Sequence, residues 1–197
     1  MRMRKSEFAY FPSLIYREEK PEWVGVTKNL LNRVEEETRD CSFDTQIFQT
    51  SLLQDEEVFC VQEHLMFECV DSLGREGHDV NSYQYKPALW GQKLYLGGNH
   101  FTHVHRDAVM CALYFLETPE LGAYPIFSDP RPGKEMGSLR PVFGGEVTPA
   151  VSDIHFNNIV PGTILYFASW LPHRLNPSQT KDATSFLHFT LSAIEAS

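Results

Sequence analysis

Two kinds of hydrophobic spacing divide the chain, and the change falls near residue 80. Before that point apolar residues recur at intervals of three and four, which is the period of an amphipathic helix. The first such stretch opens at Pro21 and runs to about Arg39. The second runs from a good N-cap, Asp55, to Leu73, where Gly74 provides a stop. The pattern therefore predicts two helices within the first 80 residues.

Beyond residue 80 the helical period disappears, and short aromatic or β-branched runs alternate with turns that contain proline or glycine. Several short strands separated by turn signals predict a sandwich or jelly roll. The expected strands are Tyr83–Tyr85, Gln92–Leu96, Val109–Leu116, Ala123–Phe127, His155–Ile159, Thr163–Phe167 and Ser185–Leu191. An earlier apolar segment, Phe8–Tyr16, is interrupted by Pro12, which predicts an edge strand.

Together these patterns predict a mainly β chain of the α+β class that forms one domain, residues 1–197. We expect residues 1–80 to supply a strand and two helices that pack on a jelly-roll core of residues 81–197. The stretch from Asp129 to Val151 is rich in proline and glycine and carries three basic residues. Because long loops in compact domains are usually functional, this stretch is expected to act as a lid.

Charge and cysteine spacing exclude several classes of protein. The formal net charge is −9, which disfavours a nucleic-acid-binding surface. No apolar run follows the basic residues at the start and no stretch approaches transmembrane length, so neither a secretory signal nor a membrane span is expected. The four cysteines show no Cys-x-x-Cys spacing, which favours free thiols in a reducing cytoplasm over a zinc or disulfide set. The oligomeric state stays open.

The candidate chemistry begins in the run Asn99–Leu116, where His100, His103 and His105 account for three of the eight histidines. In an extended strand residues i and i+2 face the same side, so His103, His105 and Asp107 are expected to project together. Two imidazoles and a carboxylate on one face are the ligands of a non-haem Fe(II) site.

A further histidine follows a second buried strand, Thr163–Phe167. His173 lies just beyond the end of this strand, where a distal metal ligand would return to the site. The alternative is that His173 is a loop histidine packed on Trp170.

The chain resembles the Fe(II)/2-oxoglutarate-dependent oxygenases, in particular the small oxygenases common in phages and bacteria. The resemblance covers nearly the whole chain and rests on several motifs in the same order. These are Phe11–Tyr16, Pro21–Trp23, His103-Val-His105 with Cys111–Leu116, Ile126–Arg131, and Pro161–His173.

The resemblance implies a double-stranded β-helix, the jelly roll, with His105, Asp107 and His173 as the metal ligands and His103 in reserve. It also implies an oxidoreductase, a dioxygenase that consumes O₂ and 2-oxoglutarate, forms succinate and hydroxylates a substrate that the sequence does not identify. Bidentate 2-oxoglutarate and O₂ would take the open face of the iron.

One family feature is missing from the final strand. The family usually carries an Arg-x-Ser element after the distal histidine, and its arginine holds the far carboxylate of 2-oxoglutarate. Here Thr184 and Phe186 occupy those two places. Three cations and two hydroxyls are the candidates to replace the arginine: Lys93, Lys181, Arg174, Tyr95 and Tyr114.

Two other interpretations remain open at this point. One is a cupin-like metalloprotein that binds its metal through His103, His105 and His173 and does not use 2-oxoglutarate; the missing arginine favours it. The other is a non-catalytic jelly-roll binding module, against which the presence of His105, Asp107 and His173 argues.

Overall fold

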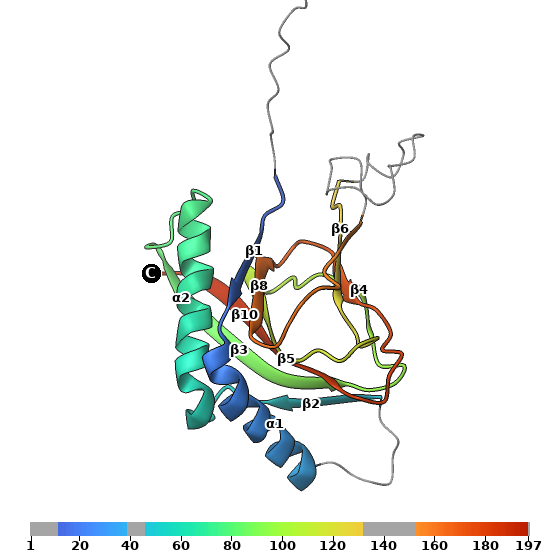
Figure 1. Ribbon diagram of the computed structural model, residues 1–197. Helices are drawn as coiled ribbons and strands as arrows, with labels where there is room; N and C mark the ends of the chain where they lie inside the picture. Colours follow the sequence, from blue (N-terminus) through green and yellow to red (C-terminus); the bar gives the residue numbers. More distant parts are fainter. Residues whose placement is uncertain (1–11, 39–45, 132–152, 197) are drawn as a thin grey trace, which may run out of the picture.

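A computed structural model describes residues 12–38, 46–131 and 153–196, and within them the chain forms two α-helices and two antiparallel sheets (Figure 1). The six-stranded sheet has the order β1 (Ile15–Glu19), β8 (Thr163–Ala168), β5 (Met110–Glu117), β10 (Thr184–Glu195), β3 (Tyr83–Leu94) and β2 (Ile47–Ser51). The four-stranded sheet has the order β4 (His100–His103), β9 (His173–Leu175), β6 (Pro125–Ser128) and β7 (Asp153–His155).

The six-stranded sheet is the middle layer of the molecule. Its two faces carry alternate residues, and each face belongs to a different hydrophobic core. Leu187 and Phe189 of β10 join the core that contains residues of both helices, whereas Phe186 joins the core shared with the four-stranded sheet. In Figure 1 the helices accordingly lie on one side of this sheet and β4 and β6 on the other. We call these the helix face and the inner face.

Both predicted helices are present and begin with a 3₁₀ turn. The first turn, η1 (Pro21–Trp23), leads into α1 (Val24–Thr38), and the second, η2 (Glu56–Val58), leads into α2 (Phe59–Arg75). The Asp55 carboxylate accepts a 3.0 Å hydrogen bond from the backbone N–H of Glu57, as expected of an N-cap.

The predicted stop of α2 is slightly early. The helix continues through Gly74 to Arg75, because the left-handed conformation that favours glycine occurs at Gly77, where φ is +93°.

The strand predictions hold best for the buried strands. The two short runs predicted at Tyr83–Tyr85 and Gln92–Leu96 are parts of one long strand, β3. It tolerates Pro87 because β2 pairs only with residues 90–94, which leaves one side of β3 open at the proline. The strand β1 does lie at a sheet edge, although it covers Ile15–Glu19, and residues 8–11 of the predicted segment lie outside the described residues. Strand β7 ends at His155, where the predicted strand begins.

Two other expectations concern the lid and membrane-spanning helices. Most of the expected lid, from residue 132 onward, lies outside the described residues. In the part of the chain that the structure describes, neither helix combines the length and the apolar character that a membrane span requires.

Candidate metal centre

Three histidines meet where β4 pairs with β9. The register of this pair sets His103 directly opposite His173, with ring centroids 4.4 Å apart. The His105 ring, just beyond β4, lies 4.9 Å from that of His103 and 5.3 Å from that of His173. One ligand atom from each of the three lies within 4.8 Å of the other two. We call this set the three-histidine group.

Backbone hydrogen bonds join the loop that carries His105 to the segment that leads into His173 on β9. The His105 N–H donates to the carbonyl of Ser169 at 3.0 Å, and the Ser169 N–H donates to Val109 at 3.1 Å. The Ser169 hydroxyl also donates to the carbonyl of Ala108. The segment before β5 is therefore tied to the segment before β9, and the two histidines keep their mutual position without a bound ion.

In two of the histidines, His103 and His173, the Nδ1 nitrogen is hydrogen-bonded to a backbone carbonyl oxygen. His103 Nδ1 lies 2.7 Å from the carbonyl oxygen of Phe101, and His173 Nδ1 lies 2.9 Å from that of Leu171. A carbonyl only accepts, so Nδ1 carries the proton, and Nε2 of the neutral ring keeps its lone pair. This is how metal-ligating histidines are oriented in proteins. The Nε2 of His105 is buried without a hydrogen-bond partner, which also suits a ligand.

The electrostatics of the site favour the neutral form of the His105 and His173 rings. Burial, and then the neighbouring His103, lowers the pKa of His105 to about 4. Burial lowers the pKa of His173 to about 3, although its hydrogen bond to the Leu171 carbonyl acts in the opposite direction. The pKa of His100 falls to about 4, chiefly through burial. At neutral pH a metal would therefore meet free lone pairs and would have few protons to displace.

Asp107 does not join the other two predicted ligands. It lies exposed in a turn after His105, and its backbone carbonyl accepts a hydrogen bond from the Ser192 hydroxyl. The expected projection of residues i and i+2 to one side requires an extended chain, but β4 ends at His103. His105 and His173 thus lie together, and their third neighbour is the reserve ligand, His103.

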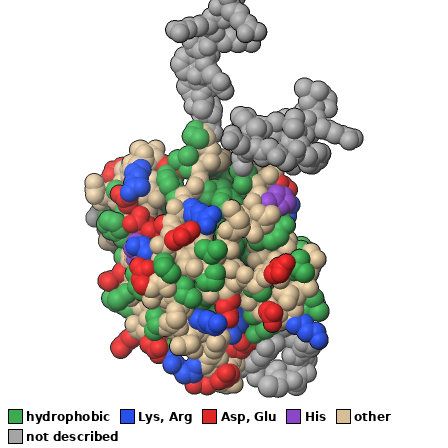
Figure 2. Space-filling model, viewed as in Figure 1, with side chains coloured by type: hydrophobic (Ala, Val, Ile, Leu, Met, Phe, Trp, Pro, Cys, Tyr) green, Lys and Arg blue, Asp and Glu red, His purple; other side chains and the backbone are tan. Residues whose placement is uncertain are grey.

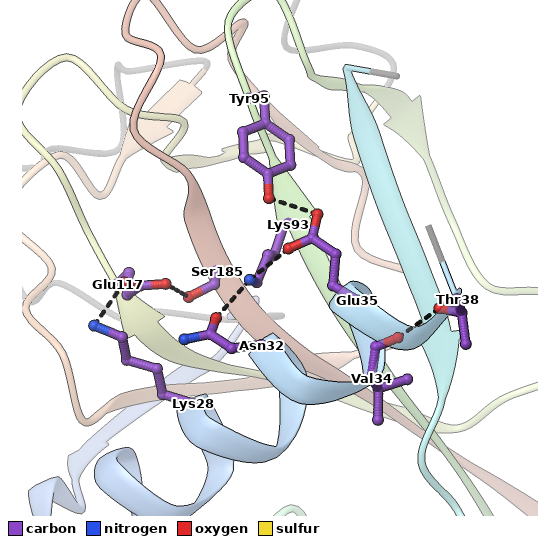
Figure 3. Close-up of polar contacts among 9 residues, drawn as sticks. All are labelled: Lys28, Asn32, Val34, Glu35, Thr38, Lys93, Tyr95, Glu117 and Ser185. Atoms are coloured by element: carbon purple, nitrogen blue, oxygen red, sulfur yellow. Dashed lines mark hydrogen bonds and ion pairs between the residues drawn. The ribbon is translucent and has the colours of Figure 1, made fainter. Parts of the chain in front are cut away.

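Three of the residues expected to bind 2-oxoglutarate lie on the helix face. Lys93 Nζ donates to Glu35 at 2.6 Å, and the Tyr95 hydroxyl donates to the other oxygen of the same carboxylate, also at 2.6 Å (Figure 3). The Tyr114 hydroxyl donates to the backbone carbonyl of Lys20 at 2.7 Å. These side chains point toward α1 and toward Lys20, which precedes the first helical turn, and not toward the histidines.

The other two candidates are also placed elsewhere. Arg174 forms a 2.7 Å ion pair with Asp153, because its neighbours His173 and Leu175 take the buried side of β9. Lys181 is exposed in the segment before β10. The hydroxyl of Thr184, at the family's arginine position, accepts a 2.9 Å hydrogen bond from the Ala123 N–H.

Two residues near the site were missed by sequence reasoning, Cys111 and His188. His188 on β10 is only 6% exposed, and its ring centroid lies 4.8 Å from that of His105. A second set of potential ligand atoms within 4.8 Å of one another consists of His105, Cys111 and His188. The available signal was a single histidine inside the otherwise apolar run Phe186–Phe189.

The donors fit a first-row divalent metal such as iron, because neutral imidazoles are good ligands for such ions. The far carboxylate of 2-oxoglutarate fits less well. Lys93 is the only lysine or arginine buried among the described residues, and it faces the helices. No buried cation of the described chain therefore meets the histidines.

Comparisons with known proteins identify the family of the chain and its fold. Residues 88–187, just over half of the chain, match the sequence model of a family described as "Putative 2OG-Fe(II) oxygenase". No curated protein matches.

Solved structures resemble the chain over most of its length. A prolyl-4-hydroxylase from Pseudomonas putida is 13% identical with a TM-score of 0.61, covering 91% of this chain and 92% of its own. A prolyl hydroxylase from Trichoplax adhaerens, in complex with a hypoxia inducible factor peptide, is 12% identical with a TM-score of 0.57, and the match covers 90% of this chain and 83% of the hydroxylase. HygX from Streptomyces hygroscopicus, with nickel and 2-oxoglutarate bound, is 11% identical with a TM-score of 0.55, and the match covers 91% of this chain and 82% of HygX. At these identities the likeness shows a shared fold.

Proposed function

The chain belongs to the 2OG-Fe(II) oxygenase family, and from that premise we propose that it is a hydroxylase whose iron is held by His103, His105 and His173. Enzymes of this family are oxidoreductases that use Fe(II), 2-oxoglutarate and O₂. Bound iron with these co-substrates supplies the oxidant, and the chain supplies the ligands and the shape of the site.

The observation that carries the proposal is the arrangement of the three imidazoles. Their ligand atoms lie within 4.8 Å of one another, and two of the rings donate Nδ1–H to backbone carbonyls. Apolar side chains surround the distal ligand: the rings of Phe167 and Phe127 lie 4.7 Å and 6.0 Å from that of His173. Such a wall restrains the ring and keeps water from the metal.

For the substrate we propose a peptide or a small molecule. The fold is shared with prolyl hydroxylases, one of them bound to a peptide. The net charge of −9 disfavours a nucleic acid. Figure 2 agrees, since lysine and arginine side chains on the visible face are scattered among acidic ones and do not gather in a patch.

We further propose one domain that works in the cytoplasm, as the resemblance to small phage and bacterial oxygenases suggests. The free thiols of Cys60, Cys69 and Cys111 are consistent with a reducing compartment.

A second function has specific support, namely a cupin-like metalloprotein that does not consume 2-oxoglutarate. The three-histidine group without Asp107, and the lack of a buried cation facing it among the described residues, both favour this alternative.

Anaerobic titration with Fe(II), with and without 2-oxoglutarate, separates the two functions. The proposed hydroxylase binds one iron, develops a weak visible charge-transfer band when 2-oxoglutarate is added, and releases succinate in O₂. Iron binding without a band or succinate would establish the cupin-like function. His78→Ala, which removes an exposed histidine, serves as the control and is expected to behave like the wild type.

A further inference from the structure

Behind the three-histidine group lies a second set of ligand atoms, which we call the thiol group: His105, Cys111 and His188. Cys111 lies on β5 and His188 on β10, two neighbouring strands in the middle of the six-stranded sheet. Cys111 is paired with Thr190, two residues beyond His188, so the two side chains are diagonal neighbours on the same face. That face is the inner one, because Cys111 belongs to the core shared with the four-stranded sheet.

His188 is buried in a way that hydrogen bonding does not explain. Its side chain is 6% exposed, and Nε2 has no hydrogen-bond partner. Leaving a buried polar group unsatisfied costs free energy, and natural proteins rarely accept that cost without a role for the group. The contacts of the ring are aromatic, with centroids 5.7 Å from Trp90 and 4.8 Å from His105.

The third member of the thiol group is a completely buried cysteine that forms no disulfide. Burial raises the pKa of the Cys111 thiol, so the sulfur keeps its proton when no ion is near. Coordination removes that proton, because a metal ion binds the thiolate. One thiolate and two imidazoles are a donor set for thiophilic ions, and zinc is commonly bound by three such ligands and a fourth, exchangeable one.

We propose that the thiol group is a second metal-binding site, that it takes zinc, and that it competes with the three-histidine group because both need His105. Tetrahedral zinc holds its ligand atoms roughly 3.4–3.7 Å apart, so side chains now within 4.8 Å need to close by only about an ångström. A neutral imidazole has one lone pair and binds one ion, so zinc held by the thiol group through His105 blocks iron. The inference goes beyond the proposed hydroxylase and does not depend on 2-oxoglutarate.

The test uses the full chain, freed of metal and kept reduced, with Co(II) as a spectroscopic substitute for zinc. We expect the wild type to bind one equivalent of Co(II) and to show a near-ultraviolet thiolate-to-cobalt charge-transfer band. Cys111→Ala should lose the band and at least tenfold in zinc affinity, while its Fe(II) affinity changes less than twofold. Cys69→Ala is the matched control and should keep the band, since Cys69 is the other completely buried free thiol among the described residues and lies on α2, in the core of the helix face.

Two more variants make the outcome decisive. His188→Gln should also lower zinc affinity at least tenfold, and it tests the site independently if Cys111→Ala does not fold. His103→Ala should lose Fe(II) binding but keep the cobalt band, which separates failure of the thiol group from failure of the proposed iron site.

The inference is overturned if the wild type shows no band, if the band survives in Cys111→Ala, or if it vanishes in His103→Ala. Binding of two equivalents at once would overturn the proposed competition between the two groups.

Discussion

The buried lysine on the helix face of the six-stranded sheet and the buried histidines on its inner face differ in how their polar atoms are partnered. On the helix face Lys93 is 5% exposed, and its ammonium donates to both Glu35 and Asn32, while Tyr95 donates to the same carboxylate (Figure 3). On the inner face the buried Nε2 atoms of His105 and His188 have no hydrogen-bond partner. A buried charge that is fully paired contributes to the fold, whereas a buried lone pair without a partner is available to an ion.

A second ion pair on the helix face, Lys28 with Glu117, also has its carboxylate fully engaged by neighbouring donors. Lys28 forms a 2.7 Å ion pair with Glu117, which also accepts a hydrogen bond from the Ser185 hydroxyl (Figure 3). Burial alone would raise the pKa of Glu117, but the contacts with Lys28 and Ser185 outweigh it and lower that pKa. The carboxylate therefore stays charged and paired. The paired charges of the helix face are thus expected to serve stability and the unpartnered histidine nitrogens of the inner face to serve ligand binding, and four substitutions test this contrast.

The largest effect is expected from Lys93→Ala. It removes the lysine of the buried Lys93–Glu35 pair, and removing one partner of a buried pair costs about 3–5 kcal/mol of unfolding free energy. Urea denaturation measures this loss. Lys28→Ala on the same face should cost less than about 1 kcal/mol, because that side chain is 40% exposed. Fe(II) affinity of the folded Lys93→Ala protein should equal that of the wild type; a weaker affinity would link the two faces.

The next effect is on metal binding. His173→Ala removes the most buried member of the three-histidine group and should lower Fe(II) affinity at least a hundredfold, about 2.7 kcal/mol. The reason is that two imidazoles alone hold such an ion poorly. Anaerobic calorimetry measures the affinity, and near-wild-type binding by this variant would exclude the three-histidine group as the iron site.

Tyr95→Phe should have a smaller effect, on stability alone. It removes one hydrogen bond to the Glu35 carboxylate and should cost roughly 1.5–3 kcal/mol of unfolding free energy. The affinity for 2-oxoglutarate, measured by titration of the iron-loaded protein, should stay the same. A tenfold weaker affinity with unchanged stability would instead support a role for Tyr95 in binding the co-substrate.

The smallest effect is expected from Asp107→Ala. Because the side chain is exposed and outside the three-histidine group, Fe(II) affinity should change less than twofold. His103→Ala, measured in parallel, should lose most of its iron. The family resemblance, which makes Asp107 a ligand and holds His103 in reserve, predicts that Asp107→Ala loses more iron than His103→Ala. The comparison therefore decides whether Asp107 moves to the metal when iron binds.

The sequence by itself determined the local elements of this protein. Spacing of three and four residues predicted both helices, and the apolar runs predicted the buried strands β5, β8 and β10 close to their observed bounds. It also predicted that His105 and His173 lie close together, because His105 precedes one buried strand of the expected jelly roll and His173 follows another. These features depend on neighbours in the chain, and residue periodicity records them directly.

Only the tertiary structure decided which groups share a site. Alternation along β3 puts Lys93 and Leu94 on opposite faces, but it does not say which face the helices cover. In the same way, the β4–β9 register brings His103 to His173, the turn after His105 removes Asp107, and the β5–β10 register brings Cys111 to His188. The physical reason is that strand pairing and layer packing join residues far apart in the sequence, and no local period encodes that choice.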